Sequence, residues 1–132
     1  DHLGTSLFDL ANGTTPNRTI LSEYHAMGST TGAFMIRNGK YKLVYYAKYE
    51  PQLFDLEADP EELTDLAGDP GFADVLADCE AKLRTICDPQ EVDARAKARQ
   101  AAQLEANGGR DTVIARGDLG FSVPPGVAPD FD

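Results

Sequence analysis

The stretch AFMIRNGKYKLVYYA, residues 33–47, decides the fold. Asn38-Gly39 lies near its centre, between two runs that are rich in aromatic and aliphatic residues. Such a pair is the strongest short-range signal of a β-hairpin, because a type I′ turn needs positive φ at both central positions. The sequence therefore predicts two antiparallel strands, over 33–37 and 40–47.

The predicted turn also divides the side chains of the hairpin between two faces. With Asn38-Gly39 in the central positions, Arg37 pairs with Lys40, and successive residues alternate in direction. One face is apolar and should belong to the core: Phe34, Ile36, Tyr41, Leu43 and Tyr45. The other face is basic and amphipathic: Met35, Arg37, Lys40, Lys42 and Tyr46.

Further elements are expected on both sides of the hairpin. Residues 18–24 alternate loosely and residues 53–56 follow a proline, so each segment predicts a strand. A helix is predicted over 71–86, where apolar residues recur at spacings of three and four. Its apolar stripe should lie across the core face of the sheet. The pattern is typical of an α+β fold, with a small antiparallel sheet of about four strands packed by one amphipathic helix.

The C-terminal part of the chain has a different character. Asp88-Pro89 predicts the start of a second helix, which runs to about residue 106 and ends at Asn107-Gly108-Gly109. This helix is rich in Ala and charged residues and gains little stability from burial, so it should pack against a neighbouring chain or domain. Residues 117–132 hold three prolines and three glycines and predict an extended arm. We therefore predict an α+β domain over 1–87 and a helical and extended extension over 88–132.

The composition narrows the classes of partner. A formal net charge of −10 repels phosphate backbones, so no nucleic-acid partner is expected. No apolar run approaches the roughly 18 residues that span a membrane, so no membrane partner is expected either. Residues 18–49 carry five basic residues and one acidic residue, whereas residues 50–80 carry eleven acidic residues and no Lys or Arg. The basic stretch could attract an anionic substrate, but an exposed strand face beside an acidic neighbour is the favoured interpretation.

The chain lacks the parts of a complete enzyme. It has two histidines, His2 and His25, and no Cys/His spacing that fits a zinc site. No glycine-rich phosphate loop and no Gly-x-Ser-x-Gly motif occurs. The acidic residues of 55–62 could bind a metal or act in acid–base chemistry, but a solvated acidic turn is the favoured interpretation. Cys79 and Cys87 are interpreted as reduced core cysteines in preference to a disulfide.

Three strings resemble the C-terminal region of sulfatases in both order and spacing. The string EPQLFDLEADPEELTDLAGDP, residues 50–70, is similar to a strand-and-turn string of that family. MIRNGKYKL, residues 35–43, resembles the family's hairpin, and LGTSL, residues 3–7, with Leu10-Ala11 resembles the stretch before it. The resemblance covers residues 3–86, and residues 88–132 are similar to the C-terminal extension of bacterial choline-sulfatase-like members.

The turn within 50–70 also has a physical explanation. Asp55 and Asp59 are suited to holding it by bonds from their carboxylates to backbone N–H groups. Apolar residues should pin the turn against the sheet: Phe54, Leu56, Leu63 and Leu66. These roles are structural.

The resemblance implies the C-terminal subdomain of a sulfatase, a sulfuric ester hydrolase of the alkaline phosphatase superfamily. The family's nucleophile, metal carboxylates and catalytic Lys and His belong to its N-terminal catalytic domain, so none is carried onto this chain, which alone should be inactive. That domain would supply a divalent cation, calcium, and a formylglycine made from Cys or Ser. The string at Cys87 departs from the nucleophile motif Cys/Ser-x-Pro-x-Arg, because Glu91 stands where the arginine belongs. The implied partners are the catalytic domain and further copies of the chain in a homo-oligomer.

Tyr24 and His25 are the one candidate contribution to the active site, as residues on the rim of the substrate cleft. An ordinary strand end with a solvent-exposed histidine is the favoured interpretation. Two other functions stay open: the same region of a phosphonate monoester hydrolase or phosphodiesterase, and a freestanding, non-catalytic interaction module. The compartment is also open between cytoplasm and periplasm, with reduced cysteines favouring the cytoplasm.

Overall fold

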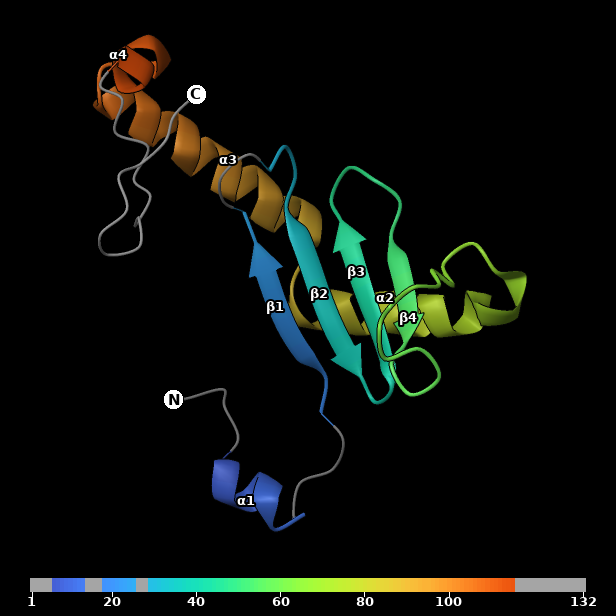
Figure 1. Cartoon of the computed structure of the whole chain (residues 1–132). Coiled ribbons are helices and arrows are strands. Elements are labelled where there is room, and N and C mark those ends of the chain that lie inside the picture. The colour runs from blue at the N-terminus through green and yellow to red at the C-terminus, as the bar shows by residue number, and fades with distance from the viewer. Residues whose placement is uncertain (1–5, 14–17, 26–28, 116–132) are drawn as a thin grey trace, which may run out of the picture. The chain divides into compact units, whose positions relative to one another are not determined.

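The computed structural model describes residues 6–13, 18–25 and 29–115 (Figure 1). Contacts divide the chain into two compact units, residues 1–94 and 95–132. The first unit contains a four-stranded antiparallel sheet in the order β1-β2-β3-β4. Its elements are α1 (Leu7–Ala11), β1 (Ile20–Tyr24), β2 (Ala33–Asn38), β3 (Tyr41–Tyr46), β4 (Gln52–Asp55), the 3-10 turn η1 (Pro70–Phe72) and α2 (Ala73–Ile86). Helix α3 (Pro89–Ala106) passes from the first unit into the second, which also contains α4 (Arg110–Ala115).

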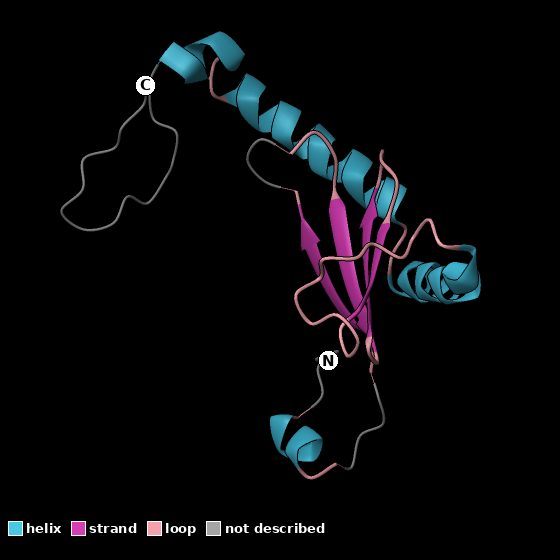
Figure 2. Cartoon of the chain, turned by 45° about the vertical axis from the view of Figure 1, so that its right-hand side comes forward, coloured by secondary structure: helices cyan, strands magenta, loops and turns pink. Residues whose placement is uncertain are grey.

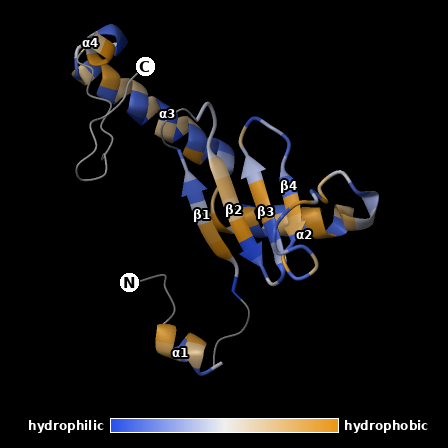
Figure 3. Ribbon diagram, in the orientation of Figure 1, coloured by the Kyte–Doolittle hydropathy of each residue, from blue (hydrophilic) through white to orange (hydrophobic). Residues whose placement is uncertain are grey.

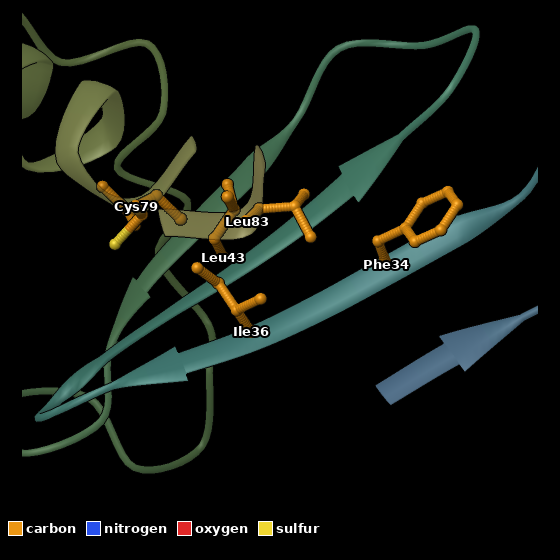
Figure 4. Close-up of a cluster of buried hydrophobic side chains, with 6 residues drawn as sticks. Phe34, Ile36, Leu43, Cys79 and Leu83 are labelled. Atoms are coloured by element: carbon orange, nitrogen blue, oxygen red, sulfur yellow. The ribbon is translucent and has the colours of Figure 1, made fainter. Parts of the chain in front are cut away.

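The predicted α+β fold is confirmed, with α2 packed against one face of the sheet (Figure 2). Strand β2, strand β3 and helix α2 supply most of the fully buried side chains that form the core (Figure 4). The core consists of Phe34, Ile36, Leu43, Leu53, Cys79 and Leu83. The predicted apolar face is therefore correct, because Tyr41 and Tyr45 also pack against this cluster.

The hairpin has the predicted faces but a different register. Arg37 pairs with Lys42, and Asn38 remains in the strand opposite Tyr41. The two central positions of the turn are thus Gly39 and Lys40, and only Gly39 has positive φ, at 61°. This is the pattern of a type II′ turn, so the predicted type I′ turn is wrong. The slip of two positions in the partner strand preserves the faces, because the side chains alternate with a period of two.

The loop after β4 is built as predicted from short carboxylate bonds. Asp55 Oδ1 accepts from the backbone N–H groups of Glu57 and Ala58, at 3.1 and 3.2 Å. Asp59 Oδ2 accepts from the N–H of Thr64 at 2.8 Å. These are satisfied turn contacts, which supports the structural interpretation of the acidic residues.

One predicted contact of this loop is wrong. Leu66 packs against the core and Phe54 is buried, but Leu63 is 78% exposed. Glu62 just before it has a φ of 57°, in the left-handed region, and Leu63 points to solvent. Leu63 therefore does not pin the turn against the sheet.

The basic face of the hairpin pairs with the acidic loop. Lys40 Nζ lies 2.6 Å from Asp55 Oδ2, and Lys42 forms an ion pair with Glu62. The hydrogen bond from Lys40, together with the loop N–H bonds, holds the pKa of Asp55 below its ordinary value of 3.8. The same bond raises the pKa of Lys40 above its ordinary value of 10.5.

These two shifts predict how the Lys40–Asp55 pair depends on pH. The carboxylate contributes stability above pH 3.8 and loses it as the pH falls through the lowered pKa of the folded state. The ammonium contributes below pH 10.5 and loses its share as the pH rises through its raised pKa. Thermal melting should show that Lys40→Gln lowers the Tm between these limits and that the difference from the native chain shrinks outside them. A pH-independent difference would contradict this assignment.

The cysteines and the helix junction agree with the structural interpretation. Cys79 and Cys87 form no disulfide; Cys79 is fully buried and Cys87 is half-buried at the end of α2. Burial raises the pKa of both thiols. Asp88 caps α3, because its Oδ1 accepts from the N–H groups of Gln90 and Glu91 at 2.9 and 3.2 Å.

Helices lie towards both ends of the described part of the chain. Residues 7–11, part of the stretch whose sequence resembles that before the sulfatase hairpin, form the short helix α1. The second predicted helix is confirmed as α3, whereas the arm at 117–132 lies outside the described residues. The proposed domain boundary after residue 87 stays a prediction. Within the described part, no helix is both long and apolar enough to cross a membrane.

Candidate functional site

His25 follows the last residue of β1, at the end of the sheet where β2 begins. Its ring packs against Phe34 with 5.3 Å between centroids and an interplanar angle of 77°. The side chain is only 17% exposed, so the favoured interpretation of a solvent-exposed histidine is wrong. Tyr24, in contrast, pairs with Ala33 at the strand end and is exposed. Strand alternation puts Tyr24 on the opposite face from Glu23, whose carboxylate lies 3.8 Å from His25 Nε2.

Gly32 forms the wall beside the imidazole. A Cβ atom at this position would lie 2.8 Å from His25 Cε1 and 2.9 Å from His25 Nδ1. The same point lies 3.1 Å from Oδ1 of Asp93. The absence of a side chain at Gly32 is therefore what leaves room for the ring.

Asp93 reaches this place from α3. Its carboxylate accepts the backbone N–H of Gly32 at 2.6 Å, across 61 positions of the sequence, and its side chain is almost completely buried. The C=O of Gly32 in turn accepts from the N–H of Ala47 at 3.1 Å. Both backbone polar groups of Gly32 are thus bonded to other segments.

Local contacts fix the start of α3 and hence the position of Asp93. Asp88 caps the helix, and Gln90 Nε2 donates to the hydroxyl of Tyr45 in β3 at 2.6 Å. Pro89 and Asp93 are four residues apart and therefore share one face of the helix. Both are buried, so this face of the first turns packs inward.

The sequence identified His25 but missed Gly32 and Asp93 as its neighbours. Gly32 stood out only as one of two glycines in a polar loop, and Asp93 was one charged residue among many in an Ala-rich helix. The available signal was the spacing of Pro89, Val92 and Asp93, which marks one inward face, since Val92 also packs against the core. An imidazole can donate a hydrogen bond to an anion or accept one from a hydroxyl group, but both ring nitrogens of His25 are almost completely buried in this structure.

The described residues do not offer a metal site. Across 6–13, 18–25 and 29–115, no group of three or more His, Cys, Asp or Glu side chains could hold a metal ion. Carboxylates of the acidic loop bond to backbone N–H groups and to a lysine instead: Asp55, Asp59 and Glu62. The described residues therefore contain no candidate set of ligands for the divalent cation that the sequence resemblance implies.

Comparison with known proteins gives consistent matches. The family model described as "N-sulphoglucosamine sulphohydrolase, C-terminal" matches residues 2–103. Choline-sulfatase of Rhizobium meliloti is 49% identical over 67 residues, covering 51% of this chain and 13% of the relative. Arylsulfatase K of Mus musculus is 38% identical over 78 residues, covering 57% and 14%. The solved structure of a 2-O GAG sulfatase, BT1596, has a TM-score of 0.56 at 29% identity, covering 72% of this chain and 20% of that chain.

The chain spans only 13% to 20% of the length of these three proteins. The family match at 2–103 nevertheless includes β1 to β4, α2 and most of α3. His25, Gly32 and Asp93 all lie within it.

Proposed function

Since this chain belongs to the family of N-sulphoglucosamine sulphohydrolase C-terminal domains, we propose that it completes the substrate cleft of a sulfuric ester hydrolase. The resemblance to sulfatases predicted from the sequence is confirmed by the family match and by two sulfatase relatives. Because the chain spans a small part of those relatives, the reaction belongs to a longer protein. The partner of this subdomain would be an N-terminal catalytic domain.

The position of His25 is the observation that carries the proposal. Its imidazole is held against buried Phe34 and beside Gly32, at the end of the sheet. The side chain of His25 is 17% exposed, but both ring nitrogens are almost completely buried, so a bond to an anionic ester group would need the ring to turn or its nitrogens to be uncovered. We place His25 on the rim of the cleft, with exposed Tyr24 as a second rim residue on the other face of β1.

The chemical step would be carried out by groups outside the described residues. A formylglycine would supply the nucleophile, and a divalent cation, taken as calcium, would bind the sulfate group. Both belong to the proposed catalytic domain. The residues of this chain would contact and orient the substrate but would not act as nucleophile, metal ligand or leaving-group acid.

Helix α1 offers a surface for docking on that catalytic domain. Leu7 and Phe8 are exposed, and α1 is coloured largely as hydrophobic in Figure 3. Large contiguous apolar surfaces are typical of interaction sites, and these two side chains would contribute to such a surface. Most of the length of the related proteins lies outside this chain, so the proposed occupant of this surface is the catalytic domain.

The substrate test uses the enzyme encoded by the complete reading frame that contains this chain. We expect it to hydrolyse an aryl sulfate, and His25→Ala should lower kcat/KM by about tenfold to a hundredfold while Tyr24→Ala has a smaller effect. Thermal melting of each variant checks that it is folded. Hydrolysis of an aryl phosphonate but not of the sulfate would favour a phosphonate monoester hydrolase. If the reading frame encoded no catalytic domain and the protein hydrolysed neither ester, the freestanding interaction module would be the remaining function.

We also propose that the C-terminal extension joins copies of the protein into a homo-oligomer. In the second unit, Leu104 and Ile114 are exposed on helices that are otherwise rich in Ala and charge. Deletion of residues 107–132 from the complete enzyme should reduce its oligomer size, as measured by light scattering after gel filtration. An unchanged mass would contradict this role.

A further inference from the structure

We propose that Asp93 is a positioning residue that holds His25 at the cleft rim by bonding to the backbone of Gly32. The inference rests on the proposed function, because it assigns the residue that keeps the rim histidine in place. Asp93 acts through Gly32 and touches no substrate in this proposal. A residue of α3 would thus determine the position of a rim histidine that follows β1.

The bond between Asp93 and Gly32 has the features of a fixed anchor. A carboxylate that is 5% exposed is costly to bury unless it is hydrogen-bonded. Its bond to the Gly32 N–H is short, at 2.6 Å, and hydrogen bonds to an ionised acceptor are stronger than those between neutral groups. The bond links a loop beside β2 to the start of α3, so neither segment can shift without breaking it.

The second step leads from Gly32 to the imidazole. Gly32 is held on its other side by the N–H of Ala47, so its backbone is fixed from two directions. The ring of His25 occupies the space that a side chain at Gly32 would fill. Phe34 contacts the ring as well. His25 is thus confined by Gly32 and Phe34. Gly32 has no side chain with which to hold its own position, and the bond from its N–H to Asp93 keeps it in place.

Two variants separate a hydrogen-bond anchor from other roles of Asp93. Asp93→Ala removes the acceptor, whereas Asp93→Asn keeps an oxygen acceptor of the same shape and loses the charge. Asp88→Ala is the matched control, because Asp88 also bonds to backbone N–H groups at the start of α3 but has no bond to Gly32. The control thus weakens the same end of the helix without touching the proposed anchor.

The position of His25 is measured by NMR in the full 132-residue chain. The sequence has two histidines, so only two imidazole Cε1–H signals are expected, and His2→Gln assigns them. The ring of Phe34 lies 5.3 Å away, and its ring current makes the His25 signal sensitive to small displacements. Asp93→Ala should move this signal towards that of an unstructured histidine. Asp93→Asn and Asp88→Ala should leave it close to its native position.

Two results would overturn the anchor: an unmoved His25 signal in Asp93→Ala, or an equal displacement in Asp93→Asn. In the complete enzyme, Asp93→Ala should raise KM for an aryl sulfate by about tenfold, and Asp93→Asn should restore most of the native value. If His25→Ala left the kinetics unchanged while Asp93→Ala still displaced the ring, the proposed function would fail and the anchor would stand. The kinetics of His25→Ala therefore test the proposed function, and the NMR signal of His25 in Asp93→Ala tests the anchor.

Discussion

Replacing Leu43 with alanine is expected to remove about 3–4 kcal/mol from the free energy of unfolding of the first unit. Leu43 is fully buried and lies among Ile36, Leu53 and Leu83, where the sheet meets α2 (Figure 4). Truncation to alanine loses the transfer free energy of the buried side chain and leaves a cavity, which together cost about 2–5 kcal/mol. Because small domains are stable by only about 5–15 kcal/mol, this single change removes a large share of the total. Urea denaturation followed by circular dichroism measures it.

Leu63→Ala is the matched control for this prediction. The same side chain is removed, but Leu63 is 78% exposed and has no place in the core cluster. Its loss should change the unfolding free energy by about 0.5 kcal/mol or less. Equal effects of the two substitutions would mean that Leu63 is buried. The prediction that Leu63 packs the turn of residues 50–70 against the sheet would then be correct.

The hairpin shows which part of a fold a sequence can predict. Its faces follow from the two-residue period, so they were correct even though the turn was assigned to the wrong pair of residues. The register depends on which two residues occupy the central positions. Asn38 can enter a turn or stay in a strand, and here its side-chain amide donates to Asp78 of α2 at 3.2 Å. That contact comes from tertiary structure and has no local signal.

The same division applies to the carboxylates. Asp55 and Asp59 bond to backbone groups two to five positions away, so their roles could be predicted from the turn sequence alone. Asp93 bonds to a residue 61 positions away, and no sequence pattern connects it with Gly32. His25 could be named as a site residue because it follows a strand, whereas the group that holds it depends on how α3 packs.

A Gly32→Ala substitution in the complete enzyme is expected to damage activity more than stability. The new Cβ would lie 2.8 Å from His25 Cε1, and atoms this close cannot both remain in place. The nearest atoms belong to the imidazole, with Oδ1 of Asp93 at 3.1 Å, so the ring must shift in its contact with Phe34, at a cost of about 1 kcal/mol, the low end of the overpacking range. Activity on an aryl sulfate should fall by roughly tenfold to a hundredfold, because a misplaced contact group costs that much.

Gly68→Ala supplies the control, because a Cβ at Gly68 meets no atom within 4 Å. The φ of Gly68 is not positive, so alanine fits its backbone conformation. Gly68→Ala should leave the free energy of unfolding unchanged or raise it slightly, because alanine lowers the entropy of the unfolded chain. The comparison therefore separates a general effect of Gly→Ala from the loss of space for His25. If Gly32→Ala lowered the Tm strongly and Asp93→Ala did the same, the contact would serve the fold, and the loss of activity would follow from unfolding. A stable Gly32→Ala enzyme that hydrolyses the ester poorly requires instead that the space beside Gly32 sets the position of the imidazole.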